Sequence, residues 1–294
     1  MSELKVVENP EIKRTSDNAP VVRFTNVTKI FFQGTKREFT AIKDVTFEVD
    51  DIPGVGEFIA VIGPSGCGKS TMLNIIAGLA PHFPPTSGTA LIRNKPIIGP
   101  GKDRAMIFQK YSSFPHRNVL SNVKFGIEMM NTEERKELIG ADPTEENIDA
   151  YAMEWLKKVR LAGSEYKFPH QLSGGMQQRV AIARSLALKP RIILMDEPFS
   201  ALDEPTRLLM QDLILRLWEE VQATVFIISH SIAEAVYLGD RIWVYSNSPG
   251  TIAFEIQGIP RYRGTSFEVQ EMPEFKENVQ IVTEAFQTIT QSLD

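Results

Sequence analysis

The chain has 294 residues, of which 43% are hydrophobic and 23% are charged, with a formal net charge of -5. Such a composition is typical of one large globular domain or two small ones. Because the net charge is negative, the chain offers no basic surface of the kind that binds nucleic acid, and we expect no nucleic-acid partner. The single cysteine, Cys67, excludes an intrachain disulfide and fits a reducing compartment. No stretch approaches the roughly 18 apolar residues of a membrane-spanning helix, and the polar first residues lack a secretory signal.

Residues 1–20 are predicted to form a flexible arm. After the arm, β-branched alternation predicts strands over 21–27 and 41–49, and a continuous apolar run predicts a buried strand over 58–63. Three later apolar runs, each closed by a polar residue, predict further buried strands over 191–196, 223–229 and 241–246. Because helical patterns lie between these strands, we expect an α/β fold on a mainly parallel sheet with helices on both faces.

The middle of the chain, from about 112 to 172, shows no convincing buried strand and predicts helices instead. We therefore expect a helical subdomain inserted into the α/β core. Residues 204–220 predict an amphipathic helix, and 254–294 an extension that ends in another. The first of these helices is expected to carry one apolar face with Leu209, Leu213 and Leu217.

The most glycine-rich stretch of the chain follows the strand that begins at Phe58 and reads Gly63-Pro64-Ser65-Gly66-Cys67-Gly68-Lys69-Ser70. It matches a phosphate-binding loop, in which glycine and four further residues precede Gly-Lys-Ser. Glycines let backbone N–H groups turn inward around an anion, and the following helix offers its positive end to the same anion. Lys69 is expected to reach the β- and γ-phosphates, and Ser70 to ligate Mg²⁺. The strand–loop–helix context favours this interpretation over a plain tight turn.

Two adjacent carboxylates, Asp196 and Glu197, close the predicted strand 191–196. Charged groups at the end of a buried strand are costly unless they meet a cation. Asp196 is therefore expected to hold Mg²⁺, directly or through water, and Glu197 to polarise an attacking water. The alternative is an ordinary acidic turn, which the nearby phosphate-binding loop makes less convincing.

A second glycine-rich helix start lies at Leu172, where Ser173 is a good N-cap followed by Gly174 and Gly175. Such a helix start is a second anion site. One nucleotide cannot easily occupy both loops of one chain unless the fold brings them together. The alternative is that the second site serves the nucleotide of a partner chain.

The octet Leu172–Arg179, Leu-Ser-Gly-Gly-Met-Gln-Gln-Arg, resembles the signature motif of the ATP-binding cassette (ABC) family. The resemblance covers about residues 21–250, and the other motifs of the family follow in the right order. Gln109 resembles the family's Q-loop glutamine, Ser200–Asp203 its D-loop, and His230 its switch histidine. Phe31 matches the position whose ring stacks on adenine, with neighbouring Phe32 as a competitor.

This resemblance implies a P-loop NTPase (RecA-like) fold, with an antiparallel β part and an ATPase domain over 21–253 that binds ATP and Mg²⁺. The residues implied in catalysis are Glu197, His230, Lys69 and Gln109, and those implied in metal binding are Ser70, Gln109 and Asp196. The implied nucleotide-binding residues are Phe31, Gly63, Pro64, Ser65, Gly66, Cys67, Gly68, Lys69, Ser70, Thr71, Gln109, Ser173, Gly174, Gly175, Gln177, Asp203 and His230. Two copies, or one copy and a homologous ATPase subunit, are expected to pair head to tail, with each ATP between one phosphate-binding loop and the partner's Ser173–Gly175.

Within that family, the segment after Gln109 resembles importer subunits, and 246–252 resembles cassettes of nitrate, sulfonate, taurine and bicarbonate importers. The resemblance therefore implies an ATP-hydrolysing subunit that powers uptake of a small solute through separate transmembrane permease subunits. These would dock near the Gln109 loop, on the cytoplasmic face of the plasma membrane. Two alternatives stay open: a soluble cassette ATPase that acts on a nucleic-acid or protein complex, and a nucleotide-gated regulatory module. Ser231 stands where the family usually has aspartate, and we expect little catalytic loss from it.

Overall fold

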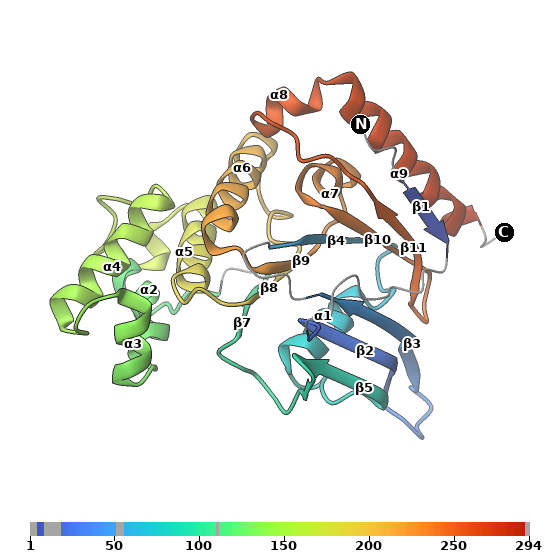
Figure 1. The fold of residues 1–294 in the computed structure, drawn as a ribbon, viewed down its shortest axis with the longest axis horizontal. Helices are drawn as coiled ribbons and strands as arrows, with labels where there is room; N and C mark the ends of the chain where they lie inside the picture. The colour runs from blue at the N-terminus through green and yellow to red at the C-terminus, as the bar shows by residue number, and fades with distance from the viewer. Residues whose placement is uncertain (1–4, 9–18, 51–55, 110–111, 292–294) are drawn as a thin grey trace.

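The computed structural model describes residues 5–8, 19–50, 56–109 and 112–291 (Figure 1). The strands are β1 (Lys5–Glu8), β2 (Val22–Phe31), β3 (Phe39–Val49), β4 (Phe58–Ile62), β5 (Ser87–Ile92), β6 (Lys95–Pro96), β7 (Arg104–Ile107), β8 (Ile192–Asp196), β9 (Thr224–Ile228), β10 (Arg241–Tyr245) and β11 (Ile252–Gln257). The helices are α1 (Lys69–Ala77), α2 (Val119–Glu128), α3 (Thr132–Ile139), α4 (Glu145–Lys158), the 3-10 helix η1 (Pro169–Gln171), α5 (Gly174–Leu186), α6 (Glu204–Val221), α7 (Ile232–Leu238), α8 (Ser266–Gln270) and α9 (Pro273–Gln291).

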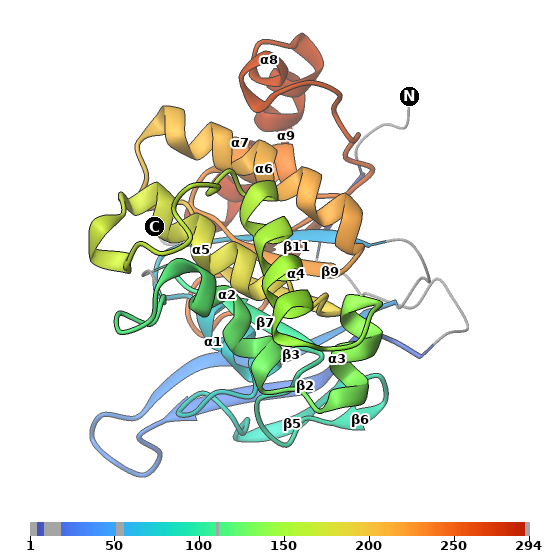
Figure 2. The same ribbon diagram turned by 90° about the vertical axis from the view of Figure 1, so that its left-hand side faces the viewer.

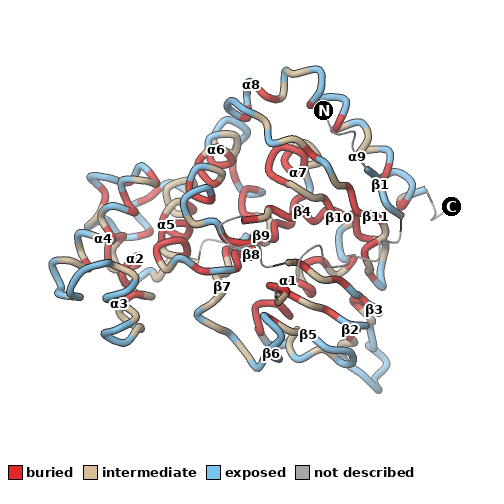
Figure 3. The backbone as a smooth tube through the Cα atoms, viewed as in Figure 1, coloured by how far each residue is buried: buried red, intermediate tan, exposed pale blue. Residues whose placement is uncertain are grey.

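A seven-stranded sheet in the order β1-β11-β10-β4-β9-β8-β7 forms the centre of the molecule. Strands β10, β4, β9, β8 and β7 run parallel to their neighbours, and β11 and β1 are added antiparallel at one edge. Every residue of β4 and β9 is buried, as expected for strands covered on both faces (Figure 3). The prediction of a mainly parallel sheet with helices on both faces is confirmed.

The two faces of the large sheet pack against different partners (Figures 1 and 2). On one face lie α1 and a four-stranded antiparallel sheet in the order β3-β2-β5-β6, and their shared core includes Phe24, Phe47 and Trp243. On the other face lie α6, α7 and α9. Because β4, β8 and β9 run parallel, their carboxyl ends lie at the same end of the large sheet. The loops that carry the predicted site begin at these strand ends.

The described residues between 112 and 172 form helices and no strand, as the sequence predicts. Trp155 on α4 and Val123 on α2 are almost wholly buried in the core that these helices share with α5. Asn122 is completely buried, and its amide donates to the carbonyls of Phe114, Arg117 and Asn118 at 2.9–3.2 Å. These bonds fasten the segment that follows Gln109 to α2.

Both ends of the chain differ from the sequence prediction. Lys5–Glu8 lie within the predicted flexible arm but form β1, which pairs with β11; the rest of the arm up to residue 18 lies outside the described residues. The predicted boundary at 253/254 falls inside β11, and Phe275 and Val282 of α9 belong to the main core, so the extension is not separate from the ATPase core. Strand β1 was not evident from the sequence of the arm, because its order comes from backbone pairing rather than from buried apolar side chains.

A smaller correction concerns the apolar face of α6. Leu213 and Leu217 are 3% and 4% exposed, but Leu209 is 52% exposed and lies off the buried face. Met210 on the same turn is fully buried in its place. Helical spacing predicts a broad apolar stripe along the helix, and packing against the sheet decides which residues of that stripe are buried.

The segment 246–252 packs against the glycine-rich loop. Gly250 donates its N–H to the carbonyl of Ala41 at 3.0 Å, and its carbonyl accepts the N–H of Lys43 at 3.1 Å. A β-carbon on Gly250 would lie only 1.8 Å from the carbonyl oxygen of Cys67. The segment thus supports the glycine-rich loop from behind, and this close approach requires glycine.

We expect Gly250→Ala to destabilise the protein by about 1–3 kcal/mol, the usual cost of forcing extra volume into a packed site. Because the displaced atom is a loop carbonyl, ATP affinity should fall as well. Thermal unfolding and nucleotide titration measure the two effects. Thr251→Ala, which only removes atoms from the next residue, is the matched control. Unchanged melting and affinity in Gly250→Ala would contradict the proposed close packing.

Candidate functional site

The glycine-rich loop connects β4 to α1 and adopts a conformation that its glycines make possible. Gly66 and Gly68 have φ angles of 78° and 98°, in the left-handed region. A β-carbon on Gly68 would lie 2.6 Å from the carbonyl oxygen of Ala41. The loop therefore winds tightly into the first turn of α1, whose free N–H groups point toward the loop.

Lys69 begins α1 and is only 5% exposed. Its ammonium group donates to the carbonyls of Gly63 and Pro64, each at 2.8 Å, so it lies inside the curve of the loop. Cys67 is buried beside it, and burial raises the pKa of its thiol above the ordinary value. This supports the interpretation of Cys67 as a small filler rather than a nucleophile.

Ser70 and Asp196 come together from α1 and β8. The Ser70 hydroxyl donates to Asp196 Oδ1 at 3.0 Å. Burial raises the pKa of Asp196, the Ser70 hydrogen bond opposes this rise, and the neighbouring charge of Glu197 adds to it. A hydroxyl and a carboxylate at this spacing are oxygen donors of the kind that Mg²⁺ accepts beside phosphate groups, so the residues present fit that ion.

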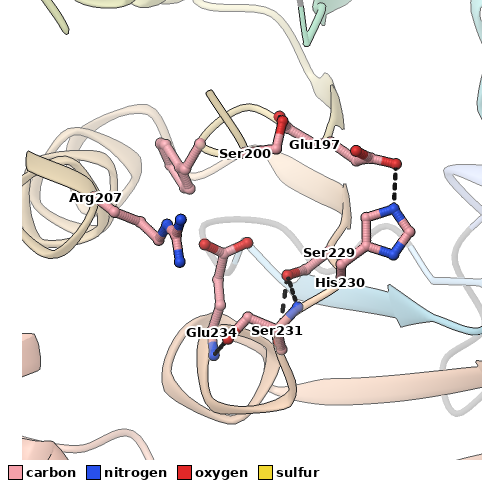
Figure 4. Close-up of a pocket in the computed structure, with 8 residues that line it drawn as sticks. Glu197, Ser200, Arg207, Ser229, His230, Ser231 and Glu234 are labelled. Carbon is pink, nitrogen blue, oxygen red and sulfur yellow. Dashed lines mark hydrogen bonds and ion pairs between the residues drawn. The ribbon is translucent and has the colours of Figure 1, made fainter. Parts of the chain in front are cut away.

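Glu197 is the centre of a cluster at the edge of the sheet (Figure 4). Its Oε1 lies 2.6 Å from His230 Nε2, and its Oε2 accepts from Gln109 Nε2 at 3.1 Å. The Ser200 hydroxyl accepts from the same Gln109 amide at 3.2 Å and donates to the Glu197 carbonyl at 3.0 Å. Glu197 has a φ of 49°, which a residue with a side chain adopts at some cost. The carboxylate is thus aimed by its backbone and by its two partners His230 and Gln109, while Ser200 holds the Glu197 carbonyl.

A pocket of about 200 Å³ joins this cluster to the glycine-rich loop. Its walls include Lys69, Ser70, Glu197 and His230, together with the ring of Phe31. Phe32 does not line the pocket and is 65% exposed, so the geometry favours Phe31 over Phe32 as the ring beside a nucleobase. The other predicted loop residues that line the pocket are Ser65, Gly66, Gly68 and Thr71.

The second glycine-rich helix start is not part of that pocket. Ser173 is exposed and caps α5, its hydroxyl accepting the N–H of Met176 at 3.3 Å. Neither it nor Gly174, Gly175 or Gln177 lines the pocket around Lys69. The structure therefore does not join the two anion sites within one chain.

Asp203 also lies outside the pocket, at the N-cap of α6. It accepts both the N–H and the hydroxyl of Thr206, and these bonds hold the pKa of its carboxyl below the ordinary value. A β-carbon on Gly175 would lie 3.0 Å from Thr206 Cγ2, so the cap of α6 packs against the start of α5.

Sequence reasoning missed several contributors to the site. Phe39 and Ala41, from the small sheet, line the pocket beside the loop. Ser200 orients Gln109 and Glu197, although only its membership of a motif was apparent from the sequence. A buried carboxylate, Glu234, lies on α7 close to His230. Its spacing from His230, just over one helical turn, was the available signal.

Comparisons with known proteins agree with this geometry. The sequence pattern of the ABC transporter family matches residues 42–200. An uncharacterised ABC transporter ATP-binding protein of Methanocaldococcus jannaschii is 44% identical over 246 residues, 83% of this chain and 85% of that protein. The nitrate import ATP-binding protein NrtD of Synechocystis is 37% identical over 86% of this chain and 90% of its own length. The taurine import ATP-binding protein TauB of Yersinia pestis is 41% identical over 72% and 76%.

A solved structure shows the same architecture. The ATP-binding cassette MJ0796, determined as a dimer in a post-hydrolysis state with ADP and Pi, is 34% identical and has a TM-score of 0.65. The match covers 83% of this chain and 99% of that one. The protein therefore belongs to the ATP-binding proteins of the ABC transporter family, and it is an ATPase that binds and hydrolyses ATP. None of the helices in the described part of the chain has the length and apolar character needed to cross a membrane.

We expect Lys69→Ala to weaken ATP binding by about ten- to hundredfold, the value of a hydrogen bond to a charged group. The ammonium group lies inside the loop and is the cation placed to meet the phosphates. Isothermal titration of ATP measures the loss, with circular dichroism to verify the fold. Lys136→Ala removes an exposed lysine that pairs with Asp142 and serves as the control. Wild-type affinity in Lys69→Ala would rule out the phosphate-cradle assignment.

Proposed function

We propose that this chain is the ATP-hydrolysing subunit of an importer for a small solute, of the class that includes nitrate, sulfonates, taurine and bicarbonate. The observation that carries the proposal is the pocket lined by Lys69, Ser70, Glu197 and His230, with Asp196 bonded to Ser70, in a chain similar to nitrate and taurine import subunits. In this proposal the chain lies on the cytoplasmic face of the plasma membrane and acts with separate permease subunits.

The proposed chemistry is hydrolysis by positioning and electrostatics. Lys69 and the N–H groups of the loop hold the phosphates, and the Phe31 ring stacks on adenine. Mg²⁺, held by Ser70 and Asp196 and sensed by Gln109, would neutralise phosphate charge. Glu197 polarises the attacking water, accepting its proton at the carboxylate, and His230 holds the γ-phosphate and orients that water.

The separation of Ser173–Gly175 from the pocket supports a head-to-tail dimer. Ser173 accepts the N–H of Met176, and the N–H groups before it lie at the helix end that attracts an anion. We propose that they bind the γ-phosphate of a nucleotide held by the partner, either a second copy or a homologous subunit. Gln177 supports this turn by donating to the Leu172 carbonyl at 3.3 Å, and Asp203 is placed nearby at the start of α6.

A groove of about 350 Å³ beside the Gln109 loop is the proposed docking site for a permease subunit. Its apolar walls are formed by Phe114 and Phe125 together with Met129, which is 60% exposed. Arg184 on α5 donates to the carbonyl and hydroxyl of Ser112 at 2.8 and 2.7 Å and lies over the Phe114 ring at 5.0 Å. A partner bound in this groove would therefore affect both the Gln109 loop and α5, the helix that Ser173 caps.

We expect Glu197→Gln to bind ATP but to hydrolyse it at least about tenfold more slowly, because the amide cannot accept the proton of the attacking water. The amide keeps the size of the side chain and one oxygen acceptor, so the pocket should stay intact. Phosphate release measures turnover, and gel filtration with ATP and Mg²⁺ should show a trapped dimer. Glu220→Gln, a surface change on α6, should behave as wild type. Undiminished turnover of Glu197→Gln would reject the proposed role of Glu197.

For the importer proposal, we expect Met129→Glu to abolish uptake and co-purification with the permease, because a charge placed in an apolar contact is left unpaired. ATP hydrolysis by the isolated subunit should stay within about twofold of wild type. Uptake of labelled nitrate and taurine by reconstituted vesicles measures transport. Phe267→Glu changes an apolar residue on α8 that is 70% exposed and is the control. Normal uptake by Met129→Glu would argue against docking at this groove.

A further inference from the structure

A cavity of about 260 Å³ adjoins the Glu197–His230 pair and extends between α6 and α7 (Figure 4). Its wall contains Glu234, a carboxylate that the proposed hydrolysis does not use and that is only 5% exposed. Burial raises the pKa of Glu234, and hydrogen bonds with Ser229 and Gln211 oppose the rise. A buried carboxylate costs free energy unless its partners compensate, so those partners indicate what it holds in place.

The first partner, Ser229, belongs to the turn that carries His230. Its hydroxyl accepts the N–H of Ser231 at 2.9 Å, so the two serines enclose His230 in a tight turn. The Ser229 hydroxyl donates its own proton to the Ser231 carbonyl at 3.2 Å. Ser231 also caps α7 by accepting the N–H of Glu234 at 3.2 Å. The direction of the His230 side chain is therefore tied to Glu234.

The other partners belong to α6. Gln211 is 2% exposed and donates to Glu234 Oε2 at 2.9 Å, while its own Oε1 has no partner. The positive charge of Arg207 faces Glu234 across the cavity. Arg207 also donates to the carbonyl of Leu202, in the segment between Glu197 and α6, at 3.2 Å. The buried Glu234 carboxylate thus joins the first turn of α7, which follows the His230 turn, to α6 through Gln211.

We propose that Glu234 is a positioning residue for ATP hydrolysis: its carboxylate, bonded to Gln211 of α6, holds the first turn of α7 in place, and its N–H, bonded to Ser231, fixes the turn that aims His230 at Glu197. Glu234 does not line the pocket around Lys69 and has no contact with the phosphate-binding loop in the hydrogen bonds described. It should therefore affect turnover and leave ATP binding alone. The inference rests on the proposed role of His230 and not on the importer proposal.

The test measures kcat and, separately, ATP affinity in the isolated full chain. Glu234→Ala should lower kcat at least about tenfold, because small displacements of catalytic groups have effects of this size or larger. Its ATP affinity should stay within about twofold of wild type. Glu234→Gln keeps an oxygen acceptor for Gln211 Nε2, and the unpaired Gln211 oxygen can accept a hydrogen bond from the new amide. This variant should recover kcat to within about threefold of wild type.

Ser229→Ala tests the link between Glu234 and His230 within the turn itself, because it removes the acceptor of the Ser231 N–H. It removes one buried atom only, so the inference stays testable even if Glu234→Ala fails to fold. It should lower kcat without lowering ATP affinity. When it is combined with Glu234→Ala, the double variant should lose no more than about twofold beyond the worse single variant, because both act through one link.

Three results would overturn the inference. The first is normal turnover in Glu234→Ala, and the second is a double variant whose loss of kcat equals the product of the two single losses. The third is a loss of both ATP binding and turnover in Glu234→Ala that Glu234→Gln does not rescue. His230→Ala separates this failure from that of the proposed mechanism. If His230→Ala is inactive while Glu234→Ala is fully active, only the role of Glu234 fails. If His230→Ala is itself fully active, the proposed role of His230 fails and the inference fails with it.

Discussion

Negative charge at the end of a buried strand is the constraint on which the site depends. Asp196 and Glu197 are neighbours at the carboxyl end of β8, where burial and the charge of Glu197 both raise the pKa of Asp196. Each carboxylate meets donors from elsewhere in the chain: Ser70 reaches Asp196, and His230 and Gln109 reach Glu197. These donors follow three different strands of the parallel sheet. The parallel order matters because it delivers all of them to one edge.

The phosphate-binding loop is shaped from outside as much as by its own sequence. Two of its glycines meet atoms of other segments at distances that leave no room for a β-carbon, Gly63 against Tyr245 and Gly68 against Ala41. Gly250 approaches the loop from the opposite direction, at the carbonyl of Cys67. The small sheet, the strand β10 and the segment 246–252 therefore interlock around the loop. A conformation that is costly in isolation is held by neighbours that cannot move independently.

How much of this was predictable depends on whether the signal was local. The buried strands β4, β8 and β9 were evident as apolar runs, and the residues of the phosphate-binding loop were evident from their spacing. Strand β7 was missed because only one of its four residues, Ile107, is buried, and its order comes from pairing with β8. Strand β1 was missed for a similar reason, because its two valines are both exposed and its order comes from pairing with β11.

Within the site, the Asp196–Glu197 pair followed from the physical cost of burying charge, whereas Gln109 and His230 were identified only through resemblance to a family. Neither residue has neighbours in the sequence that indicate a role, and their meeting with Glu197 is a property of the sheet. The contact between Gln211 and Glu234 was still less accessible, because it depends on how α6 packs against α7. Sequence spacing predicts faces of single helices and says nothing of which two faces meet.

The segment between Glu197 and α6 is short, and both of its ends are fixed. At one end Ser200 donates to the Glu197 carbonyl, and at the other Asp203 caps α6. Leu202, between them, is held by Arg207. Displacement of this segment would act on Glu197 directly, because Ser200 is bonded to the Glu197 carbonyl and to the Gln109 amide. The cap of α6 also packs against the start of α5, where Thr206 lies close to Gly175. One short segment therefore sets the backbone position of Glu197 and packs, through the cap of α6, against the start of α5.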